Sequence, residues 1–126
     1  MEVKIDTKEK FTVVTPIPAE LTANIAAEIR EKSLEKLEGP VKNIVLNLRQ
    51  VSSIHTSDAS FLANLQQEFY EKNASFVICC LQEPIEAVFA DADLLDTMNI
   101  TPTESEAWDI VQMEEIEREL LSDDDI

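Results

Sequence analysis

One short polar segment of this 126-residue chain gathers the side chains that could do chemistry. It consists of His55, Thr56, Ser57 and Asp58, and it holds the single histidine, two hydroxyls and a carboxylate. A serine, a histidine and an aspartate can form a nucleophilic triad, but a nucleophile and a base two residues apart in one turn would rarely meet. The chain also lacks a Gly-x-Ser-x-Gly elbow, a glycine-rich phosphate loop, an HExxH motif and a second histidine. We therefore expect no enzyme activity, no metal site and no cofactor.

A buried strand and an amphipathic helix are predicted to position this segment. Residues 43–48 form a short apolar run rich in β-branched residues, which is typical of a strand buried on both faces. Residues 58–72 carry apolar side chains at the helical period, namely Phe61, Leu62, Leu65 and Phe69. The hydroxyls therefore fall at a helix N-terminus, where backbone N–H groups lack partners and the dipole adds positive charge. We predict Ser57 as the N-cap of this helix, with Thr56 as the alternative.

The strand at 44–48, followed by Val51-Ser52-Ser53-Ile54-His55-Thr56-Ser57, resembles the signature of STAS domains, the anti-sigma-factor antagonist family. In that family an apolar strand leads through a short loop to an Asp-Ser-Ser/Thr-Gly-like turn that opens a helix. The second hydroxyl residue of the turn can be phosphorylated by a partner kinase. Ser57 matches this phosphoacceptor position, whereas His55 stands in place of the usual Asp and Asp58 in place of the usual Gly.

This resemblance implies a non-enzymatic interaction module that binds a serine kinase/anti-sigma factor or a related histidine-kinase-like ATPase domain. The partner would contact the loop at 52–57 and the following helix, through Ser53, His55, Thr56, Ser57, Asp58 and Phe61. Phosphorylation of Ser57, or of Thr56 as the alternative, would release the partner. Family members also serve as constitutive subunits of lipid- or anion-transport complexes, and the departures at His55 and Asp58 favour that second function.

Two roles stay open for each of the central residues. A phosphate on Ser57 would be stabilised by the helix N-terminus, but the Asp58 carboxylate opposes a second anion there. Ser57 could instead only cap the helix, which typically contributes about 1 kcal/mol, while Asp58 acts as a fixed negative charge. His55 could make partner binding pH-sensitive, or it could simply hydrogen-bond to neighbouring backbone.

The whole chain is predicted to be one mixed α/β domain with the order ββαβαβαβα. Strands are expected at 2–6, 11–15, 43–48, 75–81 and about 98–100, and helices at 19–38, 58–72 and from Pro84 to about Leu95. A fourth helix is expected to open at one of two overlapping capping boxes, at 101–104 or 103–106. The STAS resemblance implies the same order with a mixed central sheet. We expect the domain to span residues 1–121 and the acidic end at 122–126 to be frayed.

Charge and hydropathy limit the partners. The formal net charge of −16 disfavours binding of nucleic acid, anionic membranes and anionic ligands such as nucleotides. The acidic residues then either contact a basic protein partner or form a solvated surface. No apolar run approaches the roughly 20 residues that span a bilayer, so we expect no direct membrane insertion. No basic-then-apolar leader opens the sequence, and a cytoplasmic location is the expectation.

Three further features of the sequence concern the core and its edges. Cys79 and Cys80 are adjacent in a predicted strand, so their side chains should point to opposite faces and act as small buried hydrophobes. Trp108, the single tryptophan, is expected to anchor the core. The stripe Met113, Ile116 and Leu120 on the last helix is either a contact with a partner or a second copy in a homodimer, or the edge of the core.

Overall fold

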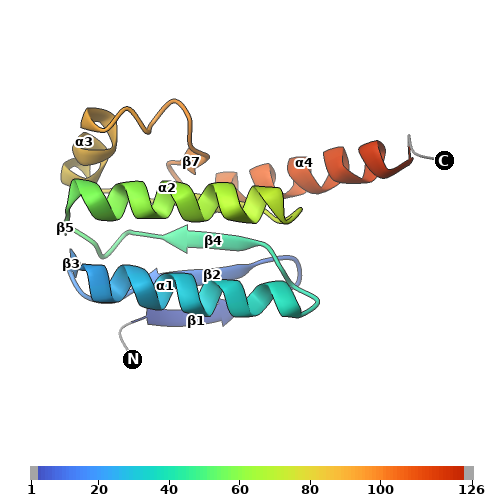
Figure 1. Ribbon diagram of the computed structural model, residues 1–126, viewed down its shortest axis with the longest axis horizontal. Helices are drawn as coiled ribbons and strands as arrows, with labels where there is room; N and C mark the ends of the chain where they lie inside the picture. The colour runs from blue at the N-terminus through green and yellow to red at the C-terminus, as the bar shows by residue number, and fades with distance from the viewer. Residues whose placement is uncertain (1–2, 124–126) are drawn as a thin grey trace.

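The structure is a computed structural model that describes the backbone of residues 3–123 and the side chains of residues 3–120. Its centre is a five-stranded mixed sheet with the order β1-β2-β4-β6-β7 (Figure 1). The strands are β1 (Val3–Thr7), β2 (Thr12–Pro16), β4 (Ile44–Asn47), β6 (Phe76–Cys79) and β7 (Ile100–Thr101). β1 pairs antiparallel with β2, and all the other pairs are parallel. The predicted mixed α/β class is confirmed.

Four α-helices cover the sheet. They are α1 (Ala23–Glu35), which continues into the 3-10 turn η1 (Lys36–Glu38), α2 (Thr56–Glu71), α3 (Glu83–Asp91) and α4 (Glu104–Asp123). α1 and α2 lie side by side on one face, and α4 lies on the opposite face (Figure 1). In the described part of the chain, no helix combines the length and the apolar character needed to cross a bilayer.

The larger core lies between the sheet and helices α1, α2 and α3. Leu46 and Ile78 from the central strands are fully buried there with Ile29 of α1 and Leu62 of α2. The alternating side-chain directions of a strand send one set of residues to this face and the next set to the other. β4 and β6 are buried along their whole length, as the apolar runs at 43–48 and 75–81 predict.

The second core is smaller and is closed by α4. Val13, Val45 and Val77 form a row of register partners across three strands, and Ala107 and Val111 of α4 pack on them. Phe11 and Trp108 stack at the edge of this core, with their ring centroids 5.1 Å apart. Trp108 thus packs against the core as expected, although it stays half-buried.

Two short strands were not predicted from the sequence. β3 (Glu20–Leu21) pairs in parallel with β5 (Ser53–Ile54) to form a separate two-stranded sheet. The predicted helix from residue 19 is therefore wrong in its first turn: α1 begins at Ala23, because the Thr22 side chain accepts a hydrogen bond from Ile25 N at 3.3 Å and caps it.

Other element ends also shift by a few residues. α3 ends at Asp91 rather than near Leu95, and Asp93 takes a left-handed φ of 58° that ends helical continuation. The start of α4 matches the second capping box, because Glu106 N donates to Thr103 Oγ1 at 3.2 Å. The helix continues to Asp123, and the predicted frayed end at 122–126 otherwise falls on residues outside the described chain.

The cysteine pair departs from the predicted strand. β6 ends at Cys79, and Cys80 has a φ of 64°, which is uncommon for a residue other than glycine. The two Sγ atoms lie 3.4 Å apart, and both side chains belong to the core that α4 closes. The prediction that they point to opposite faces is wrong, because alternation holds only while the backbone stays extended.

Candidate partner-binding site

The predicted site lies at the edge of the sheet where the parallel strands have their carboxyl ends. Asn47, the last residue of β4, is only 2% exposed and starts the connection to α2. Its Oδ1 accepts a hydrogen bond from Arg49 N at 2.9 Å, and its Nδ2 donates to Glu104 Oε1 at 3.1 Å. The asparagine therefore fixes both the first turn of the loop and the start of α4.

The rest of the loop is fixed by burial and by backbone hydrogen bonds. Leu48 and Val51 are fully buried, and Val51 N donates to Leu48 O at 3.0 Å to close a turn between them. The backbone N–H groups of Ser52 and Ser53 both donate to Ala19 O, at 2.7 and 3.2 Å. Ser53 and Ile54 then pair with β3, so the loop is held on its outer side by the segment before α1.

Helix α2 begins two residues earlier than the predicted Ser57 cap requires, and one residue earlier than the Thr56 alternative requires. The N-cap is His55, whose carbonyl accepts hydrogen bonds from Asp58 N and Ala59 N, each at 3.0 Å. Within the described residues the His55 side chain forms no capping hydrogen bond. Thr56 and Ser57 are the first two residues of the helix, so the prediction that either one is the N-cap is wrong. The strand pairing of β5 keeps the chain extended up to His55, and this sets where the helix starts.

The hydroxyl of Ser57 is consequently available to solvent. His55, Thr56 and Ser57 are all exposed, as is Ser53 before them. Asp58 is only 7% exposed and lies in the first turn, where its negative charge interacts favourably with the helix dipole. Successive helix residues project about 100° apart, which explains how two neighbours can differ so strongly in exposure.

Phe61 connects this helix start to a shallow groove. It is half-buried, and it lines a space of about 770 Å³ between α1 and α2 together with Ala27, Arg30 and Leu34. Of the six predicted contact residues, His55, Thr56 and Ser57 are exposed at the start of α2, and Ser53 is exposed in β5. Phe61 lies one turn further along α2, and Asp58 is buried. The described residues contain no group of three or more His, Cys, Asp or Glu side chains arranged to hold a metal ion.

Some residues that shape the site were not predicted from the sequence. Ala19 acts through its carbonyl oxygen, which no side-chain pattern reveals. Gln82, just before α3, donates from Nε2 to Arg49 O at 2.8 Å and holds the loop from its other side. Asn47 did carry a signal, because a polar residue inside an apolar strand must find hydrogen-bond partners when it is buried.

Comparison with known protein families identifies one match. A model of the STAS domain matches residues 2–107. Comparison with curated protein sequences gives no significant relative.

Solved structures with the same fold include regulators and part of a transporter. The anti-sigma factor antagonist SpoIIAA in its unphosphorylated form superimposes with a TM-score of 0.70 at 20% identity, over 87% of this chain and 96% of that protein. The Thermotoga maritima protein TM1081 gives a TM-score of 0.71 at 21% identity, over 87% and 94%. The murine anion transporter Slc26a9 gives 0.65 at 14% identity, over 82% of this chain but 18% of the transporter.

Proposed function

The chain belongs to the STAS domain family, and we propose that it is a cytoplasmic, non-enzymatic interaction module whose partner binds at the start of α2. The proposed partner is a kinase/anti-sigma-type protein, and the proposed contacts are Ser53, His55, Thr56, Ser57, Asp58 and Phe61. We further propose that phosphorylation of Ser57 switches this contact. The observation that supports the proposal most directly is the position of Ser57, which is exposed and is not used to cap α2.

The geometry suits a phosphoacceptor for three reasons. A kinase must reach the hydroxyl, and Ser57 lies on the outer side of the first helical turn. A phosphate there would lie beside the first backbone N–H groups of α2, where the helix dipole favours an anion. The loop before it is held by Ala19 and Gln82, so the hydroxyl is presented on a fixed backbone rather than on a mobile tip.

Phosphorylation would act on binding through charge and size. It adds about −1.5 to −2 charges at neutral pH, in the middle of the proposed contact surface. Because the buried Asp58 carboxylate projects about 100° away around the helix, the phosphate would not have to share its space, although the two charges would repel. A partner that docks on the unmodified surface would therefore be released.

The test is the modification state of the protein in its own cells. Intact-mass measurement under phosphatase inhibition, with peptide mapping, should show one phosphate on Ser57 under some growth condition. The Ser57→Ala variant should lose this phosphate and retain its partner in a pull-down under every condition. A phosphate found only on Thr56 would move the switch to that residue. A protein that stays unmodified under all conditions would contradict the proposed phosphorylation switch.

A constitutive subunit of a transport or regulatory complex is the second candidate function. It is favoured by Asp58, which places a permanent negative charge in the helix turn where a phosphate would be added. A STAS fold is also present in the anion transporter Slc26a9. A constitutive subunit should form a stoichiometric complex that is unchanged by phosphatase treatment and by Ser57→Ala. The phosphorylation switch predicts instead that both treatments change the amount of complex.

A further inference from the structure

Helix α4 exposes three large apolar side chains in a line. Met113, Ile116 and Leu120 have exposed fractions of 57%, 56% and 60%. Their spacing of three and four residues places them on one face of the helix, which we call the α4 stripe. Among the described residues only two other large apolar side chains are exposed, Ile17 in the connection after β2 and Tyr70 on α2. The stripe is therefore a concentrated apolar patch and not part of the core edge.

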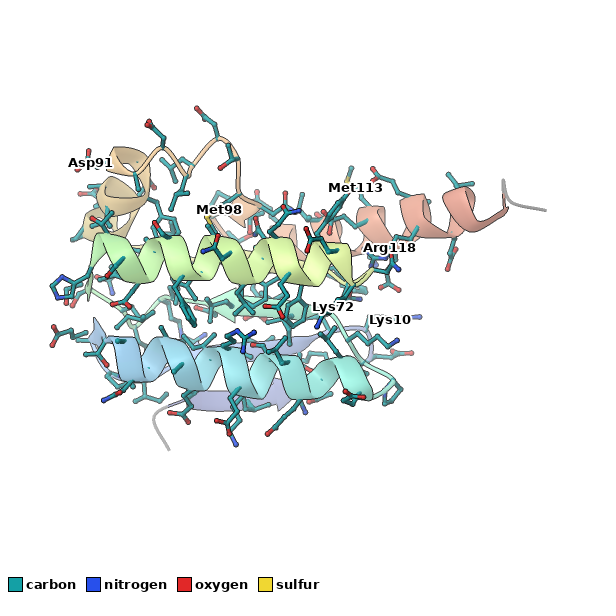
Figure 2. The ribbon with its side chains drawn as sticks, in the orientation of Figure 1. Lys10, Lys72, Asp91, Met98, Met113 and Arg118 are labelled. Carbon is teal, nitrogen blue, oxygen red and sulfur yellow. The ribbon has the colours of Figure 1, made fainter. Side chains whose placement is uncertain are left out.

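The opposite face of the same helical turns is polar and turned inward. Glu114 accepts hydrogen bonds from Ser75 Oγ at 2.6 Å and from Asn99 Nδ2 at 2.8 Å. Arg118 donates to Ser75 Oγ at 3.3 Å and to Asn43 Oδ1 at 3.4 Å. Figure 2 shows Met113 and Arg118 on opposite sides of α4. Ala107 and Val111 pack this same face of α4 on the sheet in the earlier turns, and in the later turns the side-chain hydrogen bonds keep it inward, so that the stripe faces solvent.

The charges around the stripe define what can cover it. Glu106, Asp109, Glu117 and Glu119 are exposed on α4, and the helix has a single basic residue, Arg118, which is engaged in the inward hydrogen bonds. A second copy of this chain would bring another net charge of −16 against this surface. A partner that is apolar along one face and basic along its borders would match both the stripe and its acidic surroundings.

We infer that the α4 stripe docks a basic amphipathic helix of a second protein. Such a helix would place its own apolar residues, spaced at i, i+3, i+4 and i+7, on Met113, Ile116 and Leu120. Its lysines or arginines would face Asp109, Glu117 and Glu119. The last turns of α4 project beyond the sheet, at the end of the molecule away from β5 and the start of α2 (Figure 1). This second partner could therefore bind while the site around Ser57 is occupied or free.

The inference can be tested with a defined peptide and the full chain. The probe is a fluorescent peptide of about 18 residues, five helical turns, with leucines on one face and lysines elsewhere. We expect saturable binding by fluorescence anisotropy, with affinity that falls as salt is raised. The triple variant Met113→Gln/Ile116→Gln/Leu120→Gln should weaken binding at least about tenfold, because the apolar contact is lost. All three positions are exposed, so circular dichroism should show an unchanged fold.

Matched controls separate apolar docking from general charge attraction. The double variant Ile17→Gln/Tyr70→Gln removes the other two exposed apolar side chains and should leave binding unchanged. A peptide with the same composition but with its leucines spread around the helix should bind at least about tenfold more weakly. Equal binding of the two peptides, or undiminished binding by the triple variant, would overturn the inference. So would a wild-type dimer in analytical ultracentrifugation that the triple variant converts to monomer, because a second copy would then cover the stripe.

Discussion

Asn47 at the end of β4 and Glu104 at the start of α4 are joined by a hydrogen bond of 3.1 Å, although 57 residues separate them in the chain. The same asparagine accepts a hydrogen bond from Arg49 N. One buried side chain thus connects the strand, the loop that leads to Ser57 and the helix on the far face of the sheet. The position of the proposed site depends on this connection.

Replacing Asn47 should destabilise the protein and loosen the loop. Asn47→Ala leaves Arg49 N without its acceptor, and we expect a loss of about 1–3 kcal/mol in the free energy of unfolding, measured by urea denaturation. Glu104→Ala removes only the partner of Nδ2 and should cost less. Equal losses for the two variants would mean that the bond to Arg49 N contributes nothing.

Ser57 and Thr22 should differ sharply when each is replaced by alanine. Thr22 caps α1 through its side chain, so Thr22→Ala should lower the free energy of unfolding by about 1 kcal/mol. Ser57 is exposed within the first turn of α2 and caps nothing, so Ser57→Ala should change stability by less than about 0.5 kcal/mol. A cost near 1 kcal/mol at Ser57 would show that its hydroxyl has a structural role after all.

Ser33 and Ser75 form a second matched pair. Ser33 Oγ is buried in α1 without a hydrogen-bond partner among the described residues. Ser33→Ala should therefore stabilise the protein, by up to about 1 kcal/mol, because an unsatisfied polar group is removed and alanine favours helix. Ser75→Ala should instead cost about 1–3 kcal/mol, since Ser75 Oγ donates to Glu114 and accepts from Arg118. Thermal or urea unfolding of both variants measures these two changes in the free energy of unfolding.

The two cysteines should differ in their reactivity toward an alkylating reagent. Burial raises the pKa of the Cys79 thiol far above its ordinary value, and the neighbouring Cys80 raises that pKa further. In the native protein iodoacetamide should modify the half-buried Cys80 and spare Cys79, as peptide mass mapping would reveal. Modification of Cys79 at an equal rate would contradict the buried geometry.

The same pKa shift predicts a loss of stability in alkaline solution. Above about pH 9 the unfolded chain releases the Cys79 proton while the folded chain retains it. The folded state then binds more protons than the unfolded state, so the free energy of unfolding falls as pH rises. Urea denaturation between pH 8 and roughly pH 10.5 should show a smaller fall for Cys79→Ala than for the wild-type chain. An identical fall in the free energy of unfolding of the variant and the wild-type chain would show that Cys79 is not its cause.

Periodicity in the sequence was sufficient to predict the main elements. The apolar run at 43–48 and the helical stripe from Phe61 to Phe69 each carry enough apolar residues to define a buried strand and a helix. The STAS resemblance implied the same order with a mixed central sheet, and the central sheet is mixed. Long, strongly patterned segments are predictable because burial of one face dominates their energetics.

Other features depended on contacts that no local pattern encodes. β3 and β5 have two residues each, and they form only because distant segments meet at Ala19 and Ser53. Their pairing moved the start of α2 to Thr56 and so changed Ser57 from a cap into an exposed helix residue. The left-handed backbone at Cys80 likewise has no signature in a cysteine side chain. In the last turns of α4 the inward face is polar, and it is held by hydrogen bonds to Asn43, Ser75 and Asn99, three residues from three separate segments.

The strands stand in the sheet in the same order as in the chain, from β1 through β2, β4 and β6 to β7. Each new strand of this sheet therefore pairs with the sheet strand that was made before it, and the sheet can grow from one edge as the chain leaves the ribosome. The valine row at 13, 45 and 77 gains its cover only when α4 arrives. During synthesis this apolar surface stays open longest, so a nascent chain that stops before α4 should be a substrate for chaperones and prone to aggregate.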